Sequence, residues 1–446
     1  QEYTTDKQQT ILEFARENDI YIPALCYSPY LSISGSCRMC IVEDKVNDQL
    51  VTSCTTDIYD GMEIDTKSER VEHHRKTILD LLLSDHDIEC MTCEADGDCV
   101  LQDLAYEYGL EESTFKRESE NDRIFDFYKN NEFIELDPNK CILCGKCIRV
   151  DKEVQCSDAI DFIERGFQTK VGTTFDQGFD NERSTCVFCG QCVEMCPTGA
   201  LTYIPSKNKG RAKDFRKAVT TCPYCGVGCQ LELRIKNNEI VEVGSVYRDG
   251  TPNPSGEACV KGRFGLQFVN HPDRLQKPLI RKEGELKEVE WDEALDYVAD
   301  KFTEIKQKYG PQAMAGLSSA KCTNEENYLM QKFMRAVIGT NSVDHCARLC
   351  HASTVAGLVK AFGSGAMTNS ISEIEGSDVI FITGSNPTEN HPVIGSKIKK
   401  AYKNGTKIIV ADPREIEFSP LAEVSIHQKP GTDVALLNGL MHVIIK

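Results

Sequence analysis

Residues 186–197 have the sequence CVFCGQCVEMCP, and residues 141–147 have the related sequence CILCGKC. In each motif the first three cysteines are separated by two residues, a spacing that lets neighbouring thiolates converge on one metal centre. Disulfide frameworks instead spread their cysteines to close long loops. The chain of 446 residues has 22 cysteines, most of them in such short clusters. The sequence therefore predicts metal ligation in a reducing compartment.

The repeated motif is typical of a ferredoxin with two [4Fe–4S] clusters, and we expect this domain at residues 124–206. In the CxxCxxCx3CP pattern the fourth cysteine serves the other cluster, so Cys196 should complete the first set. That set consists of Cys141, Cys144, Cys147 and Cys196.

The second set of the repeat lacks its expected cysteine, because the position equivalent to Cys196 is Asp151. Cys156 lies five residues further on and is otherwise unassigned. We predict that Cys156 completes this set; a carboxylate ligand or a three-coordinate cluster is the alternative. The other members are Cys186, Cys189 and Cys192.

Two further ligand sets precede the repeat. Residues 1–76 carry a Cx10CxxCx13C pattern, which predicts a [2Fe–2S] cluster in a β-grasp domain, with Gly35 giving the loop its freedom. Its members are Cys26, Cys37, Cys40 and Cys54. Residues 77–123 form a helical unit that ends in a charged connector and holds a mixed [4Fe–4S] set, His86, Cys90, Cys93 and Cys99. A zinc site is the alternative for both sets, and His86 could also be unligated.

A fifth set lies in a β-rich unit at residues 218–275. It has a CxxCx3C spacing with a distant fourth cysteine, which fits a [4Fe–4S] cluster or, alternatively, a zinc ribbon. Its members are Cys222, Cys225, Cys229 and Cys259.

Residues 276–446 have the pattern of an α/β domain. Apolar spacing predicts a helix at 291–309 and another at 393–402, and buried parallel strands at 379–383 and 407–410. A doubly wound sheet follows from this alternation. Ligands bind at the carboxyl ends of such strands, where the sequence places the loops GSNP (384–387) and DPR (412–414).

Several of these motifs resemble known families. The order of the [2Fe–2S] pattern, HDIECMTCEADGDCVLQ (86–102) and the ferredoxin repeat resembles the large peripheral-arm subunit of respiratory complex I, iron-only hydrogenases and NAD-linked formate dehydrogenases. The segments TCPYCGVGCQLELRIKNNEIVEV (221–243) and EACVKG (257–262) resemble the unit that opens molybdopterin oxidoreductases. That resemblance implies that Lys261 bridges the cluster and the pterin.

Residues 348–357, RLCHASTVAG, resemble the formate dehydrogenase motif. The resemblance implies that Cys350 binds molybdenum or tungsten and that His351 accepts a proton, and it favours formate over nitrate. The remaining Cys322 and Cys346 are expected to be small buried residues. The family further implies two molybdopterin guanine dinucleotides, held by Gly384, Ser385, Asn386, Pro387, Asp412, Pro413, Arg414, Gly431 and Asp433.

The sequence thus predicts a multidomain α+β and α/β protein, the catalytic subunit of a formate dehydrogenase or CO2 reductase. Its cofactors would be one [2Fe–2S] cluster, four [4Fe–4S] clusters and a Mo or W bis-pterin. Subunits of this family continue beyond the residues equivalent to 446, so we expect the rest of the catalytic domain in a longer protein or in another polypeptide. The alternatives are a complex I-like electron-transfer subunit without a working pterin site, and a nitrate-type molybdoenzyme.

The resemblance also implies a flavin-containing, NAD(P)H-binding partner subunit like that of complex I. A small [2Fe–2S] subunit and ferredoxin are further candidates. The net charge is -18, from 51 Lys and Arg against 69 Asp and Glu, so the composition lacks the excess of positive charge that nucleic-acid binding requires. The sequence has no membrane span or signal-peptide pattern, so the expected location is the cytoplasm.

Overall fold

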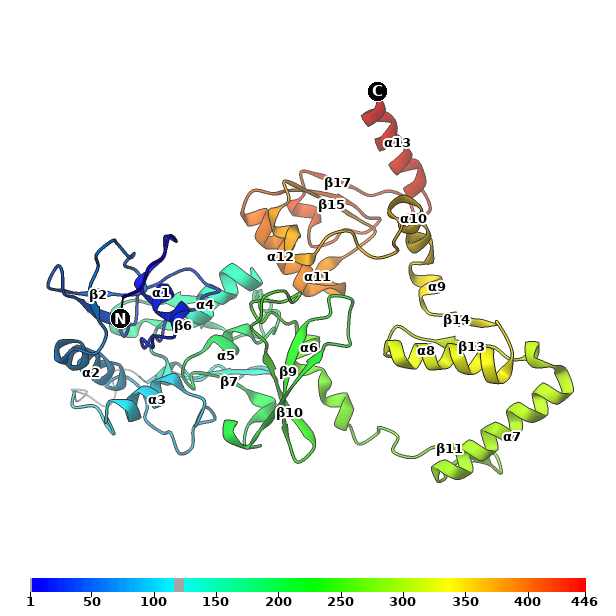
Figure 1. Ribbon diagram of the computed structural model, residues 1–446, viewed down its shortest axis with the longest axis horizontal. Coiled ribbons are helices and arrows are strands. Elements are labelled where there is room, and N and C mark those ends of the chain that lie inside the picture. Colours follow the sequence, from blue (N-terminus) through cyan, green and yellow to red (C-terminus); the bar gives the residue numbers. More distant parts are fainter. Residues whose placement is uncertain (1, 116–123) are drawn as a thin grey trace. The chain divides into compact units, whose positions relative to one another are not determined.

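The computed structural model describes residues 2–115 and 124–446 (Figure 1). The last part of the predicted connector, residues 116–123, lies outside the described residues. The chain forms two compact units, one made of residues 1–267 with 371–446 and the other of residues 268–370. In the described part of the chain, no helix combines the length and apolar character needed to cross a membrane.

The first unit begins with a small antiparallel sheet in the strand order β2-β1-β3. A capping box starts the adjoining helix: Thr10 Oγ1 accepts from the backbone of Glu13, and the Glu13 carboxylate accepts from the backbone of Thr10. The helix therefore begins at Ile11, directly after this cap. The elements are α1 (Ile11–Glu17), β1 (Ile41–Asp44), β2 (Gln49–Thr52) and β3 (Ile64–Asp65).

Two helices follow the sheet, α2 (Glu69–Leu83) and α3 (Val100–Glu107). Their apolar residues, Leu79, Leu83, Leu101 and Leu104, pack together in one buried cluster. Helix α2 is tied to the sheet by the buried Arg75, which donates two hydrogen bonds to the carbonyl of Ile41, at 3.2 and 2.7 Å. The first sheet and the helical unit are therefore packed as one body.

The ferredoxin repeat consists of two similar halves. Strand β4 pairs antiparallel with β7, and β5 pairs antiparallel with β6. The strands are β4 (Ile134–Leu136), β5 (Ile160–Ile163), β6 (Lys170–Thr173) and β7 (Leu201–Tyr203). The helices are η1 (Pro138–Lys140), α4 (Lys146–Val150), the π-helical η2 (Asp151–Gln155), η3 (Gly166–Gln168), η4 (Thr174–Asp176), α5 (Gln191–Met195), η5 (Ile204–Ser206) and η6 (Ala212–Asp214).

The next part is an antiparallel sheet in the order β10-β9-β8. Its inward side chains, Leu231 and Val243, pack against Cys222 and Cys229 in one buried cluster, so the sheet supports the fifth cysteine set. The elements are β8 (Arg216–Thr221), β9 (Gln230–Lys236), β10 (Glu239–Ser245), α6 (Val260–Phe264) and η7 (Leu266–Asn270).

A parallel sheet in the order β15-β16-β17 completes the first unit. The predicted strands and the predicted helix between them are confirmed, and Ile398 of that helix packs on Ile408 and Val410 of the central strand. The elements are η10 (Ile371–Gly376), β15 (Val379–Thr383), α11 (Pro387–Asn390), α12 (Pro392–Lys403), β16 (Lys407–Ala411), η11 (Ser419–Leu421), β17 (Val424–Ile426) and α13 (Asp433–Ile445).

The second unit contains the predicted helix at 291–309, which is confirmed with the same bounds. Strand β13 pairs parallel with β14, and β11 pairs antiparallel with β12. The elements are β11 (Leu279–Lys282), β12 (Glu285–Glu288), α7 (Trp291–Tyr309), η8 (Pro311–Ala313), β13 (Gly316–Ser318), α8 (Asn324–Lys332), η9 (Phe333–Ile338), β14 (Val343–His345), α9 (Ala347–Cys350) and α10 (Ala352–Phe362).

Candidate iron–sulfur and molybdopterin sites

The four cysteines predicted to hold the [2Fe–2S] cluster are all buried, and they form two hydrogen-bonded thiol pairs. The Cys37 thiol lowers the pKa of Cys26 to about 5, and the Cys54 thiol lowers the pKa of Cys40 to about 6. Thiolates are the form that binds iron. The hydrogen bond raises the pKa of the other thiol in each pair, Cys37 or Cys54, so the pKa shifts reflect the pairing, and the binding of two irons by these four cysteines remains a prediction.

The loop that carries these cysteines requires glycine at position 35. Gly35 has a φ of 64°, and a Cβ added there would lie 2.9 Å from Thr55 Cγ2. The buried Ser53 hydroxyl fixes the loop by donating to the Cys40 carbonyl at 2.7 Å. The sequence prediction for Gly35 agrees with this geometry, whereas the role of Ser53 had no sequence signal.

The mixed set of one histidine and three cysteines lies between α2 and α3. His86 Nδ1 is buried and has no hydrogen-bond partner in the described chain, and burial lowers the pKa of its ring. A buried neutral imidazole with a free nitrogen is suited to bind a metal. Cys99 caps α3, with its Sγ accepting from Gln102 N at 3.4 Å. This ligand set remains our prediction.

Three cavities of the first unit are each lined by a cysteine set. No group of three or more His, Cys, Asp or Glu in the described residues lies close enough to hold a single metal ion. The first cavity brings together all four residues predicted for the first ferredoxin cluster, including the one from the other half of the repeat. They are Cys141, Cys144, Cys147 and Cys196.

Arg149 joins this first cavity to the [2Fe–2S] loop. Its Nη2 donates to the carbonyl of Cys26 at 2.5 Å and to that of Cys144 at 3.3 Å, and its Nη1 donates to Ser32. The Ser36 hydroxyl also donates to the Cys144 carbonyl, at 3.3 Å. The backbones of two predicted cluster ligands therefore share one guanidinium.

The second cavity differs from the prediction at its fourth position. It is lined by Asp151 together with the three cysteines of the second motif, Cys186, Cys189 and Cys192. Cys156 does not line this cavity. It directly follows η2 and lies on the side of α12, where the charges of Lys403 and Lys400 lower the pKa of its thiol against the effect of burial. Burial raises the pKa of the Asp151 carboxyl to about 6. The structure thus brings Asp151, and not Cys156, to these cysteines.

The third cavity is lined by the complete fifth set, Cys222, Cys225, Cys229 and Cys259. The fully buried Asn253, which sequence reasoning missed, ties the two parts of this set together. Its Oδ1 accepts from Gln230 N at 2.8 Å, and its Nδ2 donates to the carbonyls of Gln230 and Glu257 at 3.0 and 2.9 Å. The cavity wall also includes Pro392 and Val393, at the start of α12.

Lys261 lies between this cavity and the first predicted pterin loop. It follows Cys259 on α6, and its Nζ donates to the carbonyl of Glu389 on α11 at 3.1 Å. Helix α11 begins at Pro387, the last residue of the GSNP loop. The position fits the bridging role that the family resemblance implies.

The predicted pterin loops follow the carboxyl ends of β15, β16 and β17. Gly384 has a φ of 56° and open space where a Cβ would lie, and Asp412 is buried with its Oδ1 accepting from Arg414 N at 2.9 Å. Gln428 holds Asp433 Oδ1 at 3.0 Å, while its own Oε1 is buried without a partner in the described chain. This orphaned acceptor and the adjoining Asp433 carboxylate fit a polar nucleotide tail.

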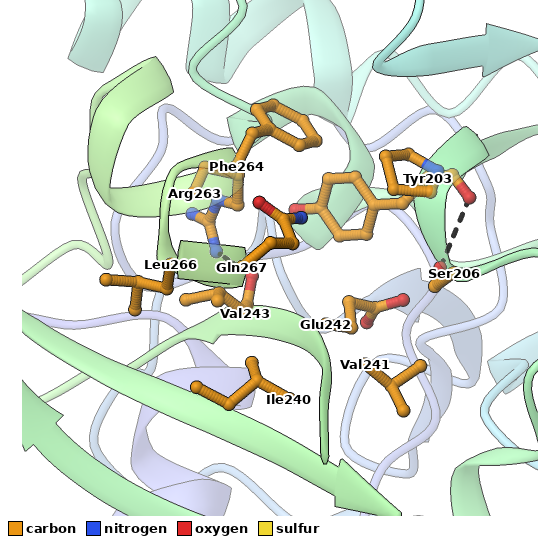
Figure 2. Close-up of a pocket in the computed structure, with 11 residues that line it drawn as sticks. Tyr203, Ser206, Ile240, Val241, Glu242, Val243, Arg263, Phe264, Leu266 and Gln267 are labelled. Atoms are coloured by element: carbon orange, nitrogen blue, oxygen red, sulfur yellow. Dashed lines mark hydrogen bonds between the residues drawn. The ribbon is translucent and has the colours of Figure 1, made fainter. Parts of the chain in front are cut away.

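Arg263 joins the second and third cluster regions and was also missed by sequence reasoning. Figure 2 shows its buried side chain beside Tyr203 and Val243. It donates to the carbonyl of Cys189 at 3.2 Å, to that of Val243 at 2.8 Å and to Ser245 Oγ at 2.8 Å. The ferredoxin repeat and the sheet β8–β10 are therefore connected through one guanidinium.

A buried ion pair connects the segment before Cys259 to α12. Lys397 Nζ lies 3.1 Å from Glu257 Oε1 and 3.0 Å from Glu375 Oε1. Burial lowers the pKa of Lys397, but the two carboxylates outweigh it and raise the pKa above the ordinary value. The ammonium therefore remains charged inside the protein.

Cys350 and His351 belong to the second unit. Cys350 is the last residue of α9 and is exposed, and His351 stands at the start of α10. Cys322 and Cys346 were expected to be buried, which is wrong: both are exposed in this unit. The Cys346 thiol accepts a hydrogen bond from Ala320 N at 3.1 Å, so its contact is polar and it does not pack in an apolar core.

Comparisons with known proteins assign each part of the chain. Five family models match: a 2Fe-2S iron-sulfur cluster binding domain (residues 1–69), the NADH-ubiquinone oxidoreductase-G iron-sulfur binding region (75–114), the ferredoxin-like domain of NADH-quinone oxidoreductase subunit 3 (131–202), the molybdopterin oxidoreductase Fe4S4 domain (215–271) and molybdopterin oxidoreductase (274–446).

Two curated relatives match the whole chain. "Probable oxidoreductase YjgC" of Bacillus subtilis (strain 168) is 33% identical, and "Putative formate dehydrogenase SAB2186c" of Staphylococcus aureus (strain bovine RF122 / ET3-1) is 34% identical. In both, the match covers 100% of this chain and 48% of the relative. The chain thus spans about half the length of these relatives.

Among solved structures, an NAD+-reducing [NiFe]-hydrogenase matches at 30% identity and a TM-score of 0.40, over 46% of this chain and 86% of that chain. Acetylene hydratase from Pelobacter acetylenicus matches at 25% identity and a TM-score of 0.40, over 52% of this chain and 32% of that chain. The two molybdopterin oxidoreductase models together match residues 215–271 and 274–446, behind three matched iron–sulfur domains, so this chain belongs to the molybdopterin oxidoreductases.

Proposed function

We propose that this chain is part of the catalytic subunit of a formate dehydrogenase, which oxidises formate to CO2 or runs the reverse reaction. The observation that carries the proposal is the Cys350–His351 pair in a chain that also holds the cluster and pterin domains. The name of the Staphylococcus aureus relative supports the same substrate. A nitrate-type enzyme would be expected to have another residue after the metal-binding cysteine.

The residue types suit the chemistry. A bound Mo or W ion with two pterin dithiolenes would supply the acceptor for two electrons. Cys350 would offer a soft thiolate to that ion, and its exposed position at the end of α9 leaves the sulfur free of packing. His351 would offer an imidazole nitrogen as the base that takes the proton released from the formate carbon.

We further propose that the electrons leave one at a time through the cluster cavities. Lys261 contacts the helix after the GSNP loop and lies next to the third cavity, and Arg263 links that region to the second cavity. The first cavity follows, and Arg149 joins it to the [2Fe–2S] loop. Four of the five proposed clusters would thereby form a continuous relay.

The partner at the far end of the relay would be a flavin-containing subunit that handles NAD(P)H, because two of the matched domains are those of complex I. A small [2Fe–2S] subunit and ferredoxin are further proposed partners, and the cytoplasm is the proposed location. The domain boundaries set out from the sequence also stand as proposals.

The test replaces Cys350 by Ala in the native holoenzyme. We expect C350A to lose formate-dependent dye reduction while dithionite still reduces all its clusters. C322A and C346A are matched controls, because both residues are exposed cysteines of the same unit, and both variants should keep the activity.

The proposal fails if C350A oxidises formate at the wild-type rate. Elemental analysis tests the alternative of a pure electron-transfer subunit, which would contain full iron but neither Mo nor W. A substrate panel with a dye acceptor tests the nitrate-type alternative.

A further inference from the structure

The two halves of the ferredoxin repeat share one backbone geometry. Leu143 and Phe188 occupy the same place in their motifs and have φ values of 52° and 50°. Gly145 and Gly190 follow two residues later with φ values of 67° and 73°, and each caps a helix of five residues. The halves are therefore equivalent residue by residue through these turns.

In both halves, the residue that follows the short helix lines the cavity of the other motif. Helix α5 is followed by Cys196, which crosses to line the cavity of the first motif. Helix α4 is followed by Asp151, which lines the cavity of the second motif. The first and third cavities are each lined by four cysteines, and the second is lined by three cysteines and this aspartate.

The two carboxylate oxygens of Asp151 differ in their surroundings. The residue is only 8% exposed, and its Oδ2 accepts from Ala159 N at 2.6 Å and from Ile160 N at 3.4 Å. Its Oδ1 accepts no hydrogen bond from the described residues. No described side chain forms an ion pair with this carboxylate, and Lys403 acts on it only from a distance. One oxygen thus fixes the side chain, and the other remains available.

Cys156, the alternative ligand, is held away from the cavity. It follows η2 with a φ of 56°, on a segment that is tied to α12 on both sides of the cysteine. Gln155 donates to the buried Ser396 hydroxyl at 2.9 Å, and Lys403 donates to Asp158 at 2.6 Å. Bringing the Cys156 sulfur to the second cavity would require breaking these contacts.

We propose that Asp151, through Oδ1, is the fourth ligand of an iron–sulfur cluster held by Cys186, Cys189 and Cys192. The inference rests on the proposed relay of clusters but not on formate as the substrate. A carboxylate is a harder ligand than a thiolate and a poorer partner for cluster iron, so the iron at this corner is the easiest to remove. Loss of that iron as Fe2+ converts [4Fe–4S]2+ to [3Fe–4S]0 without electron transfer.

The test compares D151A, D151C and C156S in the holoenzyme purified without oxygen. Iron content and Mössbauer spectra are measured first. EPR spectra are then recorded after treatment with ferricyanide, which removes one electron from [3Fe–4S]0 and gives an oxidised cluster with an EPR signal. We expect D151A to lose one iron per chain and to show a single [3Fe–4S] signal. D151C should keep that iron under ferricyanide and shift the reduction potential of only one cluster.

C156S is the matched control, because it removes a nearby buried cysteine without touching the proposed ligand. It should leave iron content and all spectra unchanged. The proposal is overturned if C156S produces the [3Fe–4S] signal, or if D151A retains the iron and the spectra of the wild type.

Should D151A fail to fold, the comparison of the wild type with D151C decides. Under ferricyanide the wild type should give the [3Fe–4S] signal and D151C should not, and equal behaviour of the two would refute the assignment. A wild type with all its clusters but no formate oxidation would contradict the proposed substrate and leave the Asp151 assignment intact.

Discussion

The buried ion pair between Lys397 and Glu257 gives the sharpest stability prediction. Both side chains are 6% exposed, and Glu257 Oε2 is already buried without a hydrogen-bond partner in the described chain. Replacing Lys397 by Met would leave the Glu257 carboxylate buried and unpaired. Breaking a buried pair in this way costs about 3–5 kcal/mol. Since Glu257 lies two residues before Cys259, we expect the cluster of the third cavity, which the fifth cysteine set would hold, to be lost first.

Lys400 provides the matched control on the same helix. It also pairs with Glu375, at 2.7 Å, but its side chain is 39% exposed. Solvent screens such a pair, so K400M should cost less than about 1 kcal/mol. The double variant K397M/E257Q should recover most of the loss of K397M, because glutamine keeps the shape of Glu257 without its charge.

The assay is the rate at which visible cluster absorbance disappears in urea without oxygen, because cluster release makes unfolding irreversible. A loss of 3 kcal/mol that acts on the unfolding barrier would accelerate this decay about a hundredfold. The reasoning is refuted if K397M and K400M decay at similar rates, or if E257Q restores nothing to K397M.

Three further outcomes follow from single side chains. R149M should slow electron transfer between the [2Fe–2S] cluster and the first [4Fe–4S] cluster several-fold in rapid-freeze EPR; an unchanged rate would contradict the proposed link. R263M removes the donor to the Cys189 and Val243 carbonyls and to Ser245 Oγ, and each buried acceptor left without a donor costs about 1–3 kcal/mol. The thermal midpoint of R263M should therefore fall by several degrees, and R263K should recover only part of this loss; an unchanged midpoint would contradict the proposed link. Burial raises the pKa of Asp80, but hydrogen bonds from Thr114 and Ser113 outweigh it and lower the pKa. That stability is present above the ordinary pKa of about 4 and is lost as the pH falls through the lower folded value, so the difference between wild type and D80N in the rate of cluster loss in urea should shrink below pH 4.

Local patterns predicted much of the fold. Helix α7 has the bounds expected from its apolar spacing, and strand β15 coincides with the apolar run at 379–383. Cysteine spacing also predicted the first and third cavities, because these ligands are set by short loops and by one crossing rule. Such features depend on residues that are close in sequence or on a regular period.

The features that sequence reasoning missed depend on contacts between distant segments. Arg263 binds the carbonyl of Cys189. Asn253 binds Gln230 and Glu257, which lie close in sequence to Cys229 and Cys259 of the fifth set. The placement of Cys156 was not predictable from its spacing, because the direction of its sulfur is set by the packing of η2 on α12. The burial expected of Cys322 came from the average behaviour of free cysteines, which says nothing of the local surroundings.

The proposed exchange of ligands between the ferredoxin halves would also constrain biogenesis. Cys196 closes a cavity whose other three thiols belong to the earlier motif, so a ribosome that has delivered only those three has not yet produced a complete cage. Assembly factors that insert iron and sulfide would have to act after both halves have emerged and folded together. Maturation should therefore be all-or-none for the pair, and a truncation within the second half would leave the first half unable to retain its cluster.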